Sequence, residues 1–302
     1  MHLRVATRKS QLALAQTQQV VDYLQQQNAS ITTDIIKVVS QGDQIQDKPL
    51  AEFGGKGLFI KGLEAELIAE RADMAMHSLK DVPPNLEAEF ALPFVLKRQS
   101  PYDVLVARDC HNLSELPKGA IIGTSSVRRQ AALLHTRPDL VVKMARGNIH
   151  TRLRKLDEGQ FDAIILAEAG LRRVGLAGRI TQVLDPQSFV PSVGQGVIAV
   201  ECLRARTDLI NLLLQFNDDE TYARITAERS MNRQLQASCT SPVGSYATID
   251  GNTLHLTGVV WQQDGSQRLE TQQTGPVEQA EVIGQTAGQD LLQQGAAALL
   301  AR

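Results

Sequence analysis

The chain has 302 residues, of which 43% are hydrophobic and 21% are charged, as in an ordinary globular protein. One hydrophobic core rarely serves so long a chain, so we expect two or three domains. Aromatic residues make up only 4%, which argues against a stacking surface for single-stranded nucleic acid.

The net charge of −2 hides an uneven distribution of charge along the chain. Residues 121–180 hold eleven Lys and Arg against five Asp and Glu, so the remainder must be acidic. A basic zone inside a near-neutral protein suggests a bound small anion more than a whole-surface polyanion such as DNA.

The three cysteines, Cys110, Cys202 and Cys239, are far apart in the sequence and have no metal-ligand spacing. They imply neither a disulfide framework nor a metal site. The first residues are charged and lack the apolar core of a secretory signal, and no run approaches the length of a membrane span. These features together predict a reducing, cytoplasmic location.

The first third of the chain alternates short apolar strands with helical patterns. Ser10 is the expected N-cap of a helix that extends to about residue 27. The predicted strands and the second helix follow in order: strands at 3–6, 33–39 and 72–77, and a helix opened by Gly54-Gly55-Lys56-Gly57.

The pattern restarts after about residue 100, which predicts a second α/β unit with a largely parallel sheet. Its expected strands are at 104–107, 120–123, 141–145 and 163–167, and residues 191–196 form a loop back to the first unit. From about residue 219 the pattern changes to a helix, then alternating segments at 245–249 and 254–260 typical of antiparallel strands, then a helical tail over 277–300.

Two α/β units in tandem predict a ligand cleft at the carboxyl ends of their strands. Three sets of basic residues follow strands of the second unit: Arg128-Arg129 after Thr124-Ser125-Ser126, Arg146-Gly147-Asn148 with Thr151-Arg152, and Arg172-Arg173. Any one set alone reads equally well as a solvated helix face. Because arginine binds carboxylates through two parallel hydrogen bonds, the three sets together indicate a ligand with several carboxylates or phosphates.

In the first unit, His77-Ser78-Leu79-Lys80-Asp81-Val82-Pro83 ends a strand. Asp81 is either an ordinary turn residue or an acid that projects into the cleft, where Lys80 and the arginines tune it. His77 reads as a core or hydrogen-bonded histidine, and with no second histidine nearby no metal site is expected. Cys239 alone reads as a small buried apolar residue, although small loop-forming neighbours make exposure of its thiol plausible.

The order and spacing of these motifs resemble hydroxymethylbilane synthases, also called porphobilinogen deaminases, over essentially the whole chain. The resemblance is carried by the following motifs: Thr7-Arg8-x-Ser10, Gly54-Gly55-Lys56-Gly57-Leu58-Phe59, His77-Ser78-x-Lys80-Asp81-Val82-Pro83, Gly123-Thr124-Ser125-Ser126-x-Arg128-Arg129, Arg146-Gly147-Asn148-x-x-Thr151-Arg152, Ala169-Gly170-Leu171-x-Arg173, Val193-Gly194-Gln195-Gly196, and Glu228-Arg229 leading to Cys239.

The resemblance implies two α/β domains like the lobes of periplasmic binding proteins around a cleft, and a smaller C-terminal α+β domain with an antiparallel sheet. We expect the first domain at 1–97 and 197–215, the second at 101–191 and the third at 219–302. It implies a transferase that condenses four porphobilinogen molecules onto a dipyrromethane primer and releases a linear tetrapyrrole by hydrolysis. It also implies a monomer that binds neither nucleic acid nor membrane and needs no metal.

The resemblance also implies roles for individual residues. Asp81 is the catalytic acid, and Cys239 carries the primer through a thioether. The other residues expected to bind the primer are Lys80, Asp81, Lys56, Ser78, Thr124, Ser126, Arg128, Arg129, Arg146 and Gly147. Those expected to bind substrate are Arg8, Ser10, Arg152, Arg173 and Gln195.

Four residues depart from the pattern of the family: Gln41, Glu52, Ala237 and Ser241. Ala237 and Ser241 flank Cys239, so an altered primer-loop geometry is a possible consequence of these two. The alternative function is a two-lobed protein that binds a polycarboxylate anion without chemistry, which the arginines fit equally well. The third domain and Cys239 argue for the enzyme.

Overall fold

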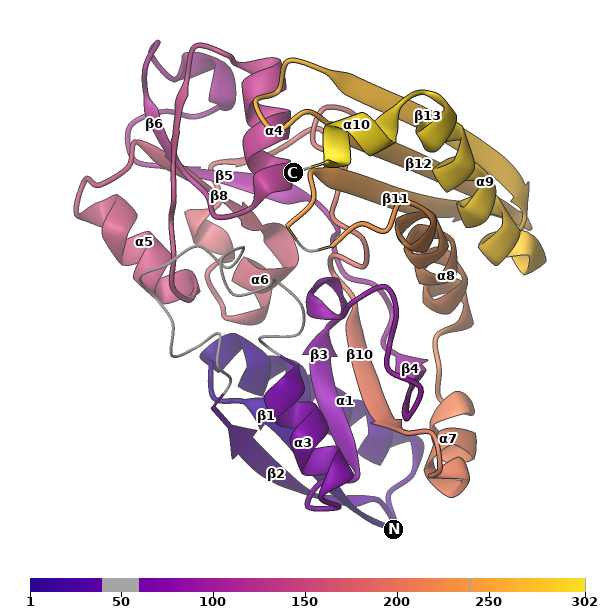
Figure 1. Ribbon diagram of the computed structural model, residues 1–302. Helices are drawn as coiled ribbons and strands as arrows, with labels where there is room; N and C mark the ends of the chain where they lie inside the picture. Colours follow the sequence, from indigo (N-terminus) through magenta and orange to yellow (C-terminus); the bar gives the residue numbers. More distant parts are fainter. Residues whose placement is uncertain (40–59, 239, 302) are drawn as a thin grey trace. The chain divides into compact units, whose positions relative to one another are not determined.

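The computed structural model describes residues 1–39, 60–238 and 240–301 (Figure 1). Their contacts group the chain into two compact units, Met1–Gln99 with Val197–Tyr222, and Ser100–Gly196 with Ala223–Arg302. The second α/β sheet and the C-terminal sheet thus belong to one unit by this grouping. The division into three domains therefore stays a prediction.

The first unit is built on a five-stranded sheet of order β2-β1-β3-β10-β4. Its strands are β1 (His2–Arg8), β2 (Thr32–Val38), β3 (Met74–Ser78), β4 (Phe90–Val95) and β10 (Ile198–Leu203). Its helices are α1 (Gln11–Gln27), α3 (Lys61–Ile68), the 3₁₀ turn η2 (Leu79–Asp81) and α7 (Thr207–Leu214). Here β1 pairs in parallel with β2 and β3, whereas β10 runs antiparallel between β3 and β4.

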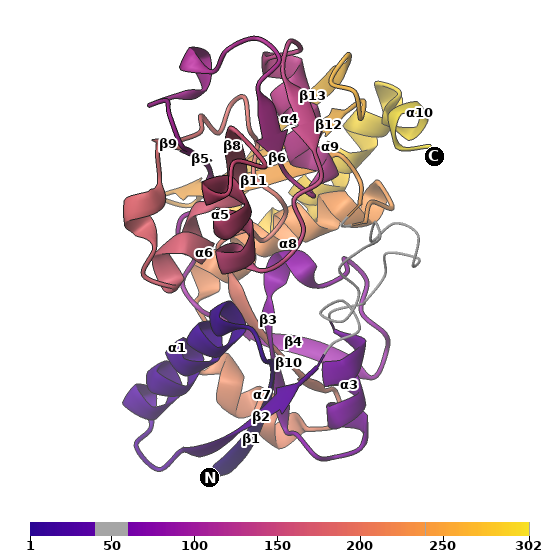
Figure 2. The same cartoon turned by 90° about the vertical axis from the view of Figure 1, so that its left-hand side faces the viewer.

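The helices α1 and α3 cover opposite faces of this sheet (Figure 2). On one face Val20 and Leu24 of α1 pack against Val5, Met76 and Val200. On the other face Leu63 and Leu67 of α3 pack against Ala6 and Ala75. Because successive side chains of a strand point to opposite faces of the sheet, the same strands supply apolar residues to both layers.

The α/β part of the second unit repeats this topology, with the order β7-β6-β8-β5-β9. Its strands are β5 (Asp103–Ala107), β6 (Ile121–Gly123), β7 (Val141–Lys143), β8 (Ala163–Ala167) and β9 (Gln182–Val183). Its helices are η3 (Leu113–Glu115), α4 (Val127–Thr136), α5 (Ile149–Asp157), α6 (Glu168–Arg173) and η4 (Ala177–Arg179). Here β5 takes the antiparallel position that β10 takes in the first sheet. Two of the four strand pairings in this sheet are antiparallel, so the prediction of a largely parallel sheet is wrong.

The C-terminal part is a three-stranded antiparallel sheet, β11 (Val243–Asp250), β12 (Thr253–Trp261) and β13 (Arg268–Pro276). It is accompanied by α8 (Asp219–Gln234), η5 (Val277–Gln279), α9 (Ala280–Gln293) and α10 (Ala296–Leu300). Leu256 and Val260 face a core shared with α8 and α9. The opposite face of β12 places Val259 and Trp261 in the core of the second α/β sheet.

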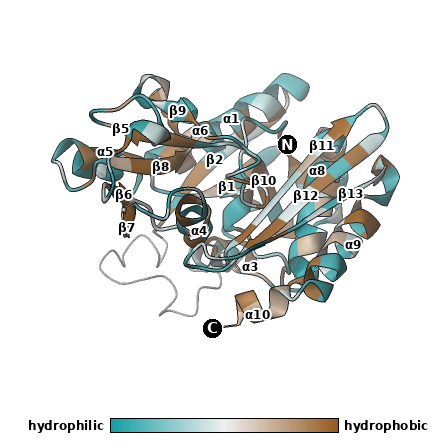
Figure 3. Cartoon of the chain, turned by 90° about the horizontal axis from the view of Figure 1, so that it is seen from above, coloured by the Kyte–Doolittle hydropathy of each residue, from teal (hydrophilic) through white to brown (hydrophobic). Residues whose placement is uncertain are grey.

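The predicted fold class is confirmed: two α/β sheets of one topology and a smaller antiparallel sheet with helices. The strongly hydrophobic strands β6 and β8 stand out in Figure 3, as expected for strands buried on both faces. Four strands had not been predicted, namely β4, β9, β10 and β13. In β13 the reason is clear, because its residues are mostly polar and half-exposed and give no apolar alternation.

Candidate functional site

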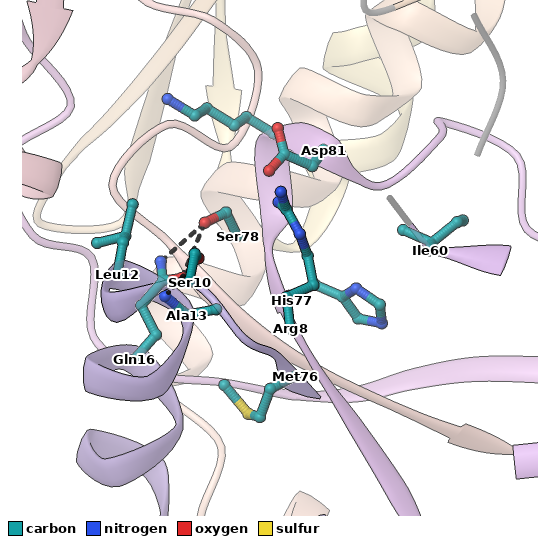
Figure 4. Close-up of a pocket in the computed structure, with 11 residues that line it drawn as sticks. Arg8, Ser10, Leu12, Ala13, Gln16, Ile60, Met76, His77, Ser78 and Asp81 are labelled. Carbon is teal, nitrogen blue, oxygen red and sulfur yellow. Dashed lines mark hydrogen bonds between the residues drawn. The ribbon is translucent and has the colours of Figure 1, made fainter. Parts of the chain in front are cut away.

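The first unit has a pocket where β1 and β3 end and α1 begins (Figure 4). Polar side chains dominate one side of it, and its lining residues are Arg8, Ser10, Leu12, Ala13, Gln16, Ile60, Met76, His77, Ser78, Lys80 and Asp81. Parallel neighbouring strands end at the same edge of a sheet, so residues 70 positions apart meet there. Five residues that the sequence predicted for the site, Arg8, Ser10, Ser78, Lys80 and Asp81, therefore share one pocket.

Asp81 reaches the pocket through a single 3₁₀ turn after β3. The backbone N–H of Leu79 donates to the carbonyl of Val197 at 3.0 Å, and that of Val82 donates to the carbonyl of Leu79 at 3.0 Å. These bonds, with the two prolines that follow, fix the turn. Figure 4 shows the carboxylate of Asp81 and the guanidinium of Arg8 pointing toward one another. The half-buried Asp81 is therefore an acid held on a rigid turn rather than a loose surface residue.

Ser10 and Ser78 are both held by hydrogen bonds in the wall of the pocket. Ser10 caps α1 as predicted, and its Oγ accepts a hydrogen bond from the N–H of Ala13 at 3.2 Å. Ser78 Oγ lies 2.8 Å from Nε2 and 3.1 Å from Oε1 of Gln16. Gln16 is buried and was not predicted as a site residue. The only available signal was a glutamine on the apolar stripe of α1.

His77 forms a buried pair with Glu201 of β10, with Nε2 2.9 Å from Oε2. The prediction of a hydrogen-bonded histidine is confirmed. Glu64 of α3 is also buried. Burial raises the pKa of Glu64 to about 7, helped by the charges of Glu201 and Glu87 and opposed by those of His77 and Lys61. Neither Glu64 nor Glu201 had been predicted as a site residue.

In the second unit the end of β6 carries Thr124, Ser125 and Ser126. Ser126 is the N-cap of α4, and its Oγ accepts from the N–H of Arg129 at 3.4 Å. Ser125 donates its hydroxyl to the carbonyl of Ala145 at 2.6 Å, and Thr124 Oγ1 accepts from the N–H of Ser126 at 3.2 Å. The three hydroxyls all take part in hydrogen bonds of the protein itself, and the anion site at this helix N-terminus stays a prediction.

Arg128 and Arg129 are buried around Asp103, the first residue of β5. Nη2 of Arg128 lies 2.7 Å from Oδ2 of Asp103, and Nε of Arg129 lies 2.9 Å from Oδ1. Gln195 donates from Nε2 to Oδ1 at 2.9 Å and to the carbonyl of Pro101 at 2.6 Å. Burial alone would raise the pKa of Asp103, but the two arginines and Gln195 lower it to about 2. Asp103 was not predicted, although an acid in an apolar strand is unusual.

Each arginine also binds a backbone carbonyl, that of Val190 for Arg128 and that of Ile165 for Arg129. Most N–H groups of the two arginines therefore donate hydrogen bonds to other groups of the protein. The spacing of residues in the sequence did not predict this. Nε of Arg128 is buried and has no hydrogen-bond partner among the described residues. The assignment of both arginines to the primer stays a prediction.

The loop between β7 and α5 holds the second set of basic residues. Asn148 caps α5 by accepting from the N–H of Thr151 at 2.9 Å. Gly147 has φ +108°, and a Cβ there would lie 2.6 Å from Cγ2 of Thr151, so only glycine fits. Arg152 donates from Nε to the carbonyl of Gly147 at 2.8 Å, and burial lowers the pKa of the half-buried Arg146.

Arg173, at the end of α6, has a guanidinium group with few hydrogen-bond acceptors around it in the described part of the chain. Its Nη2 donates to the carbonyl of Gly196 at 2.7 Å, whereas its buried Nε has no partner there. Burial lowers its pKa to about 10. A half-buried cation without a carboxylate beside it is chemically suited to bind one.

Two predicted primer ligands, Lys56 and Cys239, lie outside the described residues, as do Gln41 and Glu52. The residues beside Cys239 are described. Ala237 is buried in the core of the C-terminal sheet. Ser241 Oγ accepts a hydrogen bond from the N–H of Ser238 at 3.0 Å, so this departure from the family takes part in the turn itself.

Within the described ranges, no cluster of three or more His, Cys, Asp or Glu side chains could hold a metal ion. Nor does any described helix combine the length and the apolar composition needed to cross a membrane.

The geometry places an acid in the turn after a strand of one unit and several arginines in the loops and helices that follow strands of the other, in two α/β sheets of one topology. Two family models match the sequence. The porphobilinogen deaminase dipyrromethane cofactor binding domain matches residues 3–211, and the porphobilinogen deaminase C-terminal domain matches residues 222–293.

Curated relatives agree with these matches. The porphobilinogen deaminase of Bordetella parapertussis is 46% identical over 299 residues, covering 99% of this chain and 95% of the relative. That of Bordetella bronchiseptica matches with the same identity and coverage. The chain belongs to the porphobilinogen deaminase family.

A solved structure, a double mutant of the VFT2 domain of Bordetella pertussis BvgS, is similar with a TM-score of 0.43 and 18% identity. The similarity covers 76% of this chain and 92% of that domain. At this TM-score the likeness adds nothing to the assignment.

Proposed function

We propose that this protein is a transferase of tetrapyrrole biosynthesis, a hydroxymethylbilane synthase. It condenses four porphobilinogen molecules head to tail, releases one ammonia at each condensation, and hydrolyses the product from the enzyme. The observation that carries this proposal is the match of both family models and of close relatives over nearly the whole chain. The acid-bearing pocket of the first unit supplies the chemistry that this reaction requires.

Asp81 is the proposed catalytic acid. Loss of ammonia from porphobilinogen leaves a cationic azafulvene, and a fixed carboxylate lowers the barrier by stabilising that positive charge. A proton must also reach the departing amine, and a carboxyl group at this position can supply it. The turn of Leu79–Asp81 holds the carboxylate in place, so little reorganisation is needed during the reaction.

Each porphobilinogen brings two carboxylates, so the growing chain gains negative charge at every step. We assign these carboxylates to guanidinium groups and hydroxyls at strand and helix ends. Arg8, Ser10, Arg152, Arg173 and Gln195 are the proposed substrate ligands. The support for Arg173 is its half-buried guanidinium, whose Nε has no partner among the described residues. Gln195 donates from Nε2 to the carbonyl of Pro101 and to Asp103, beside the buried arginines.

The family's dipyrromethane cofactor is the primer for this reaction. The donors of the second unit suit a group with several carboxylates, because buried nitrogen atoms such as Nε of Arg128 remain without a partner in the described chain. When bound, the cofactor supplies a tethered acceptor carbon, which makes the condensation effectively unimolecular. Cys239 is the proposed attachment point. The other proposed primer ligands are Lys56, Ser78, Lys80, Asp81, Thr124, Ser126, Arg128, Arg129, Arg146 and Gly147.

We further propose that the protein is a cytoplasmic monomer that binds neither nucleic acid nor membrane. The free thiols of Cys110 and Cys202 are consistent with a reducing compartment. Light scattering of the purified protein tests the monomer, for which a mass of one chain is expected.

The function is tested by mixing the purified protein with porphobilinogen and measuring ammonia release, tetrapyrrole formation and intact mass together. We expect covalent mass on Cys239, further discrete mass additions with substrate, and one ammonia per porphobilinogen consumed. Asp81→Asn should lower turnover at least about a hundredfold, because electrostatic and proton-transfer contributions are both lost. Binding of porphobilinogen without ammonia release would instead identify the non-catalytic binding protein.

A further inference from the structure

The pocket of Asp81 adjoins a buried pair of ionisable side chains that the proposed chemistry does not use. Nε2 of His77 lies 2.9 Å from Oε2 of Glu201, and their side chains are 3% and 0% exposed. His77 lies opposite Ala199 in the ladder of β3 and β10. Glu201, two residues after Ala199, points to the same face of the sheet, so the bond runs diagonally between neighbouring strands.

That face of the sheet is covered by α3, and the layer between them is unusually polar. Ala75 on the same face packs against Leu63 and Leu67 of α3. Glu64 of α3 is 7% exposed and interacts electrostatically with both Glu201 and His77. Figure 4 shows the imidazole of His77 directed to the side of Ile60, which precedes α3, and away from Ser10 and Gln16.

Stability alone gives no reason for this pair. A buried ion pair loses the hydration of both groups, and well-packed apolar residues of similar size are often as stable or more so. Oε1 of Glu201 is also buried without a hydrogen-bond partner in the described chain, which adds a further cost. The location suggests another reason, because His77 lines the pocket of Asp81 and lies four residues before it on the same strand end.

We infer that Glu201 is a positioning residue for the condensation: it fixes the imidazole of His77 and, with it, the end of β3 that carries Asp81. The bond to a carboxylate keeps a proton on Nε2 of His77, which sets the orientation of the ring. The main-chain bond from Leu79 to Val197 ties the next turn to the segment that enters β10. β10 and the residue just before it thus provide two of the contacts that hold this end of β3, in addition to the bond from Val82 to Leu79 within the turn. This inference rests on the proposed function.

The experiment compares three variants at Glu201 with wild-type enzyme carrying its primer. Glu201→Leu removes both the carboxylate and the bond to His77 and puts an apolar side chain in the buried layer. Glu201→Gln keeps an oxygen that can accept the bond. Glu201→Asp keeps the carboxylate on a shorter side chain. Turnover is measured per primer-bearing molecule by intact mass, so that incomplete loading does not affect the rates. Thermal unfolding is measured on the same samples.

We expect Glu201→Leu to lower kcat about tenfold or more with KM changed less than about threefold. Its melting temperature should fall, because Nε2 of the buried His77 loses its acceptor. Glu201→Gln should recover part of the lost kcat, since its amide oxygen can still accept from Nε2. Glu87→Gln is the matched control, because this exposed carboxylate acts on the same layer only through its charge. Its kcat should equal that of wild type.

Wild-type kcat in a folded Glu201→Leu protein would overturn the inference. So would a kcat that falls only in proportion to the folded fraction, as a purely structural role requires. Should Glu201→Leu fail to fold, Glu201→Asp decides in the same way, with an unchanged kcat against the inference and a lowered kcat for it. If wild-type protein itself released no ammonia from porphobilinogen, the proposed function would fail instead, so the two failures are distinguishable.

Discussion

The carboxylate of Glu228 in α8 accepts a hydrogen bond from the backbone N–H of Gly194 at 2.8 Å. Its other oxygen accepts from the N–H of Ala247 in β11 at 2.9 Å. One fully buried side chain thus joins the loop at 191–196 to the C-terminal sheet.

Because of these two bonds, Glu228→Ala should lower the free energy of unfolding by about 3 kcal/mol, since two buried N–H groups lose their acceptor. Chemical denaturation of the purified protein measures this. Glu278→Ala, at an exposed glutamate with one long hydrogen bond of 3.5 Å, is the control and should change stability by less than about 0.5 kcal/mol. Equal effects of the two substitutions would contradict the proposed anchoring.

Asp73 should make the first unit sensitive to acid. Burial alone would raise its pKa, but hydrogen bonds from Arg4 and Arg206 lower it to about 2, below the ordinary value of 3.8. A lowered pKa stabilises the fold above pH 3.8, and this contribution is lost as the pH falls toward 2. We expect about 2 kcal/mol of stability to disappear over that range. Asp73→Asn should remove this pH dependence, whereas Asp22→Asn, at an exposed position, should leave it intact.

Glu64 should give a pH dependence of the opposite sign. Its pKa is raised by burial to about 7, so the folded state holds a proton that the unfolded chain releases above about pH 4.5. Stability from this group is complete below pH 4.5 and declines as the pH rises to about 7, by at most about 3 kcal/mol. Unfolding of Glu64→Gln should lack the decline. His77→Gln should raise the pKa of Glu64 further, and Glu201→Gln should lower it, because the two charges act in opposite directions.

Gly147→Ala should destabilise the second unit by about 2 kcal/mol or more, because φ +108° and the side chain of Thr151 both oppose a Cβ. Gly119→Ala separates the two causes, since Gly119 has φ +81° but nothing within 4 Å of the added carbon. We expect about 1 kcal/mol there. If the two substitutions cost the same, the contact with Thr151 contributes nothing.

Arg173→Gln should raise KM for porphobilinogen about tenfold, because a guanidinium available to a carboxylate is lost. Arg173→Lys should recover only part of this, since lysine keeps the charge but not the fork of donors. Arg172→Gln is the neighbouring control, as its exposed guanidinium already binds Glu168 at 2.6 Å. A KM unchanged in both Arg173 variants would remove this residue from the substrate ligands.

Elements whose signals are local can be predicted from the residues themselves. The cap formed by Ser10 satisfies an N–H group three residues away, so residue type and position suffice to predict it. Most apolar strands of the two α/β sheets followed from their composition, although β4 and β10 had not been predicted, and the family followed from the order of the motifs. The polar strand β13 gave no such signal, since only its pairing with β12 makes it a strand.

Only the tertiary structure decided which charges neutralise one another. Asp103 lies 25 residues before Arg128, and His77 lies 124 residues before Glu201, yet each pair is in direct contact. Arginines that composition assigned to a ligand therefore turned out to bind a buried carboxylate of the protein as well. Hydrogen bonds and pKa values depend on burial and on partners within a few ångströms, and the folded sheets, not the sequence spacing, bring those partners together.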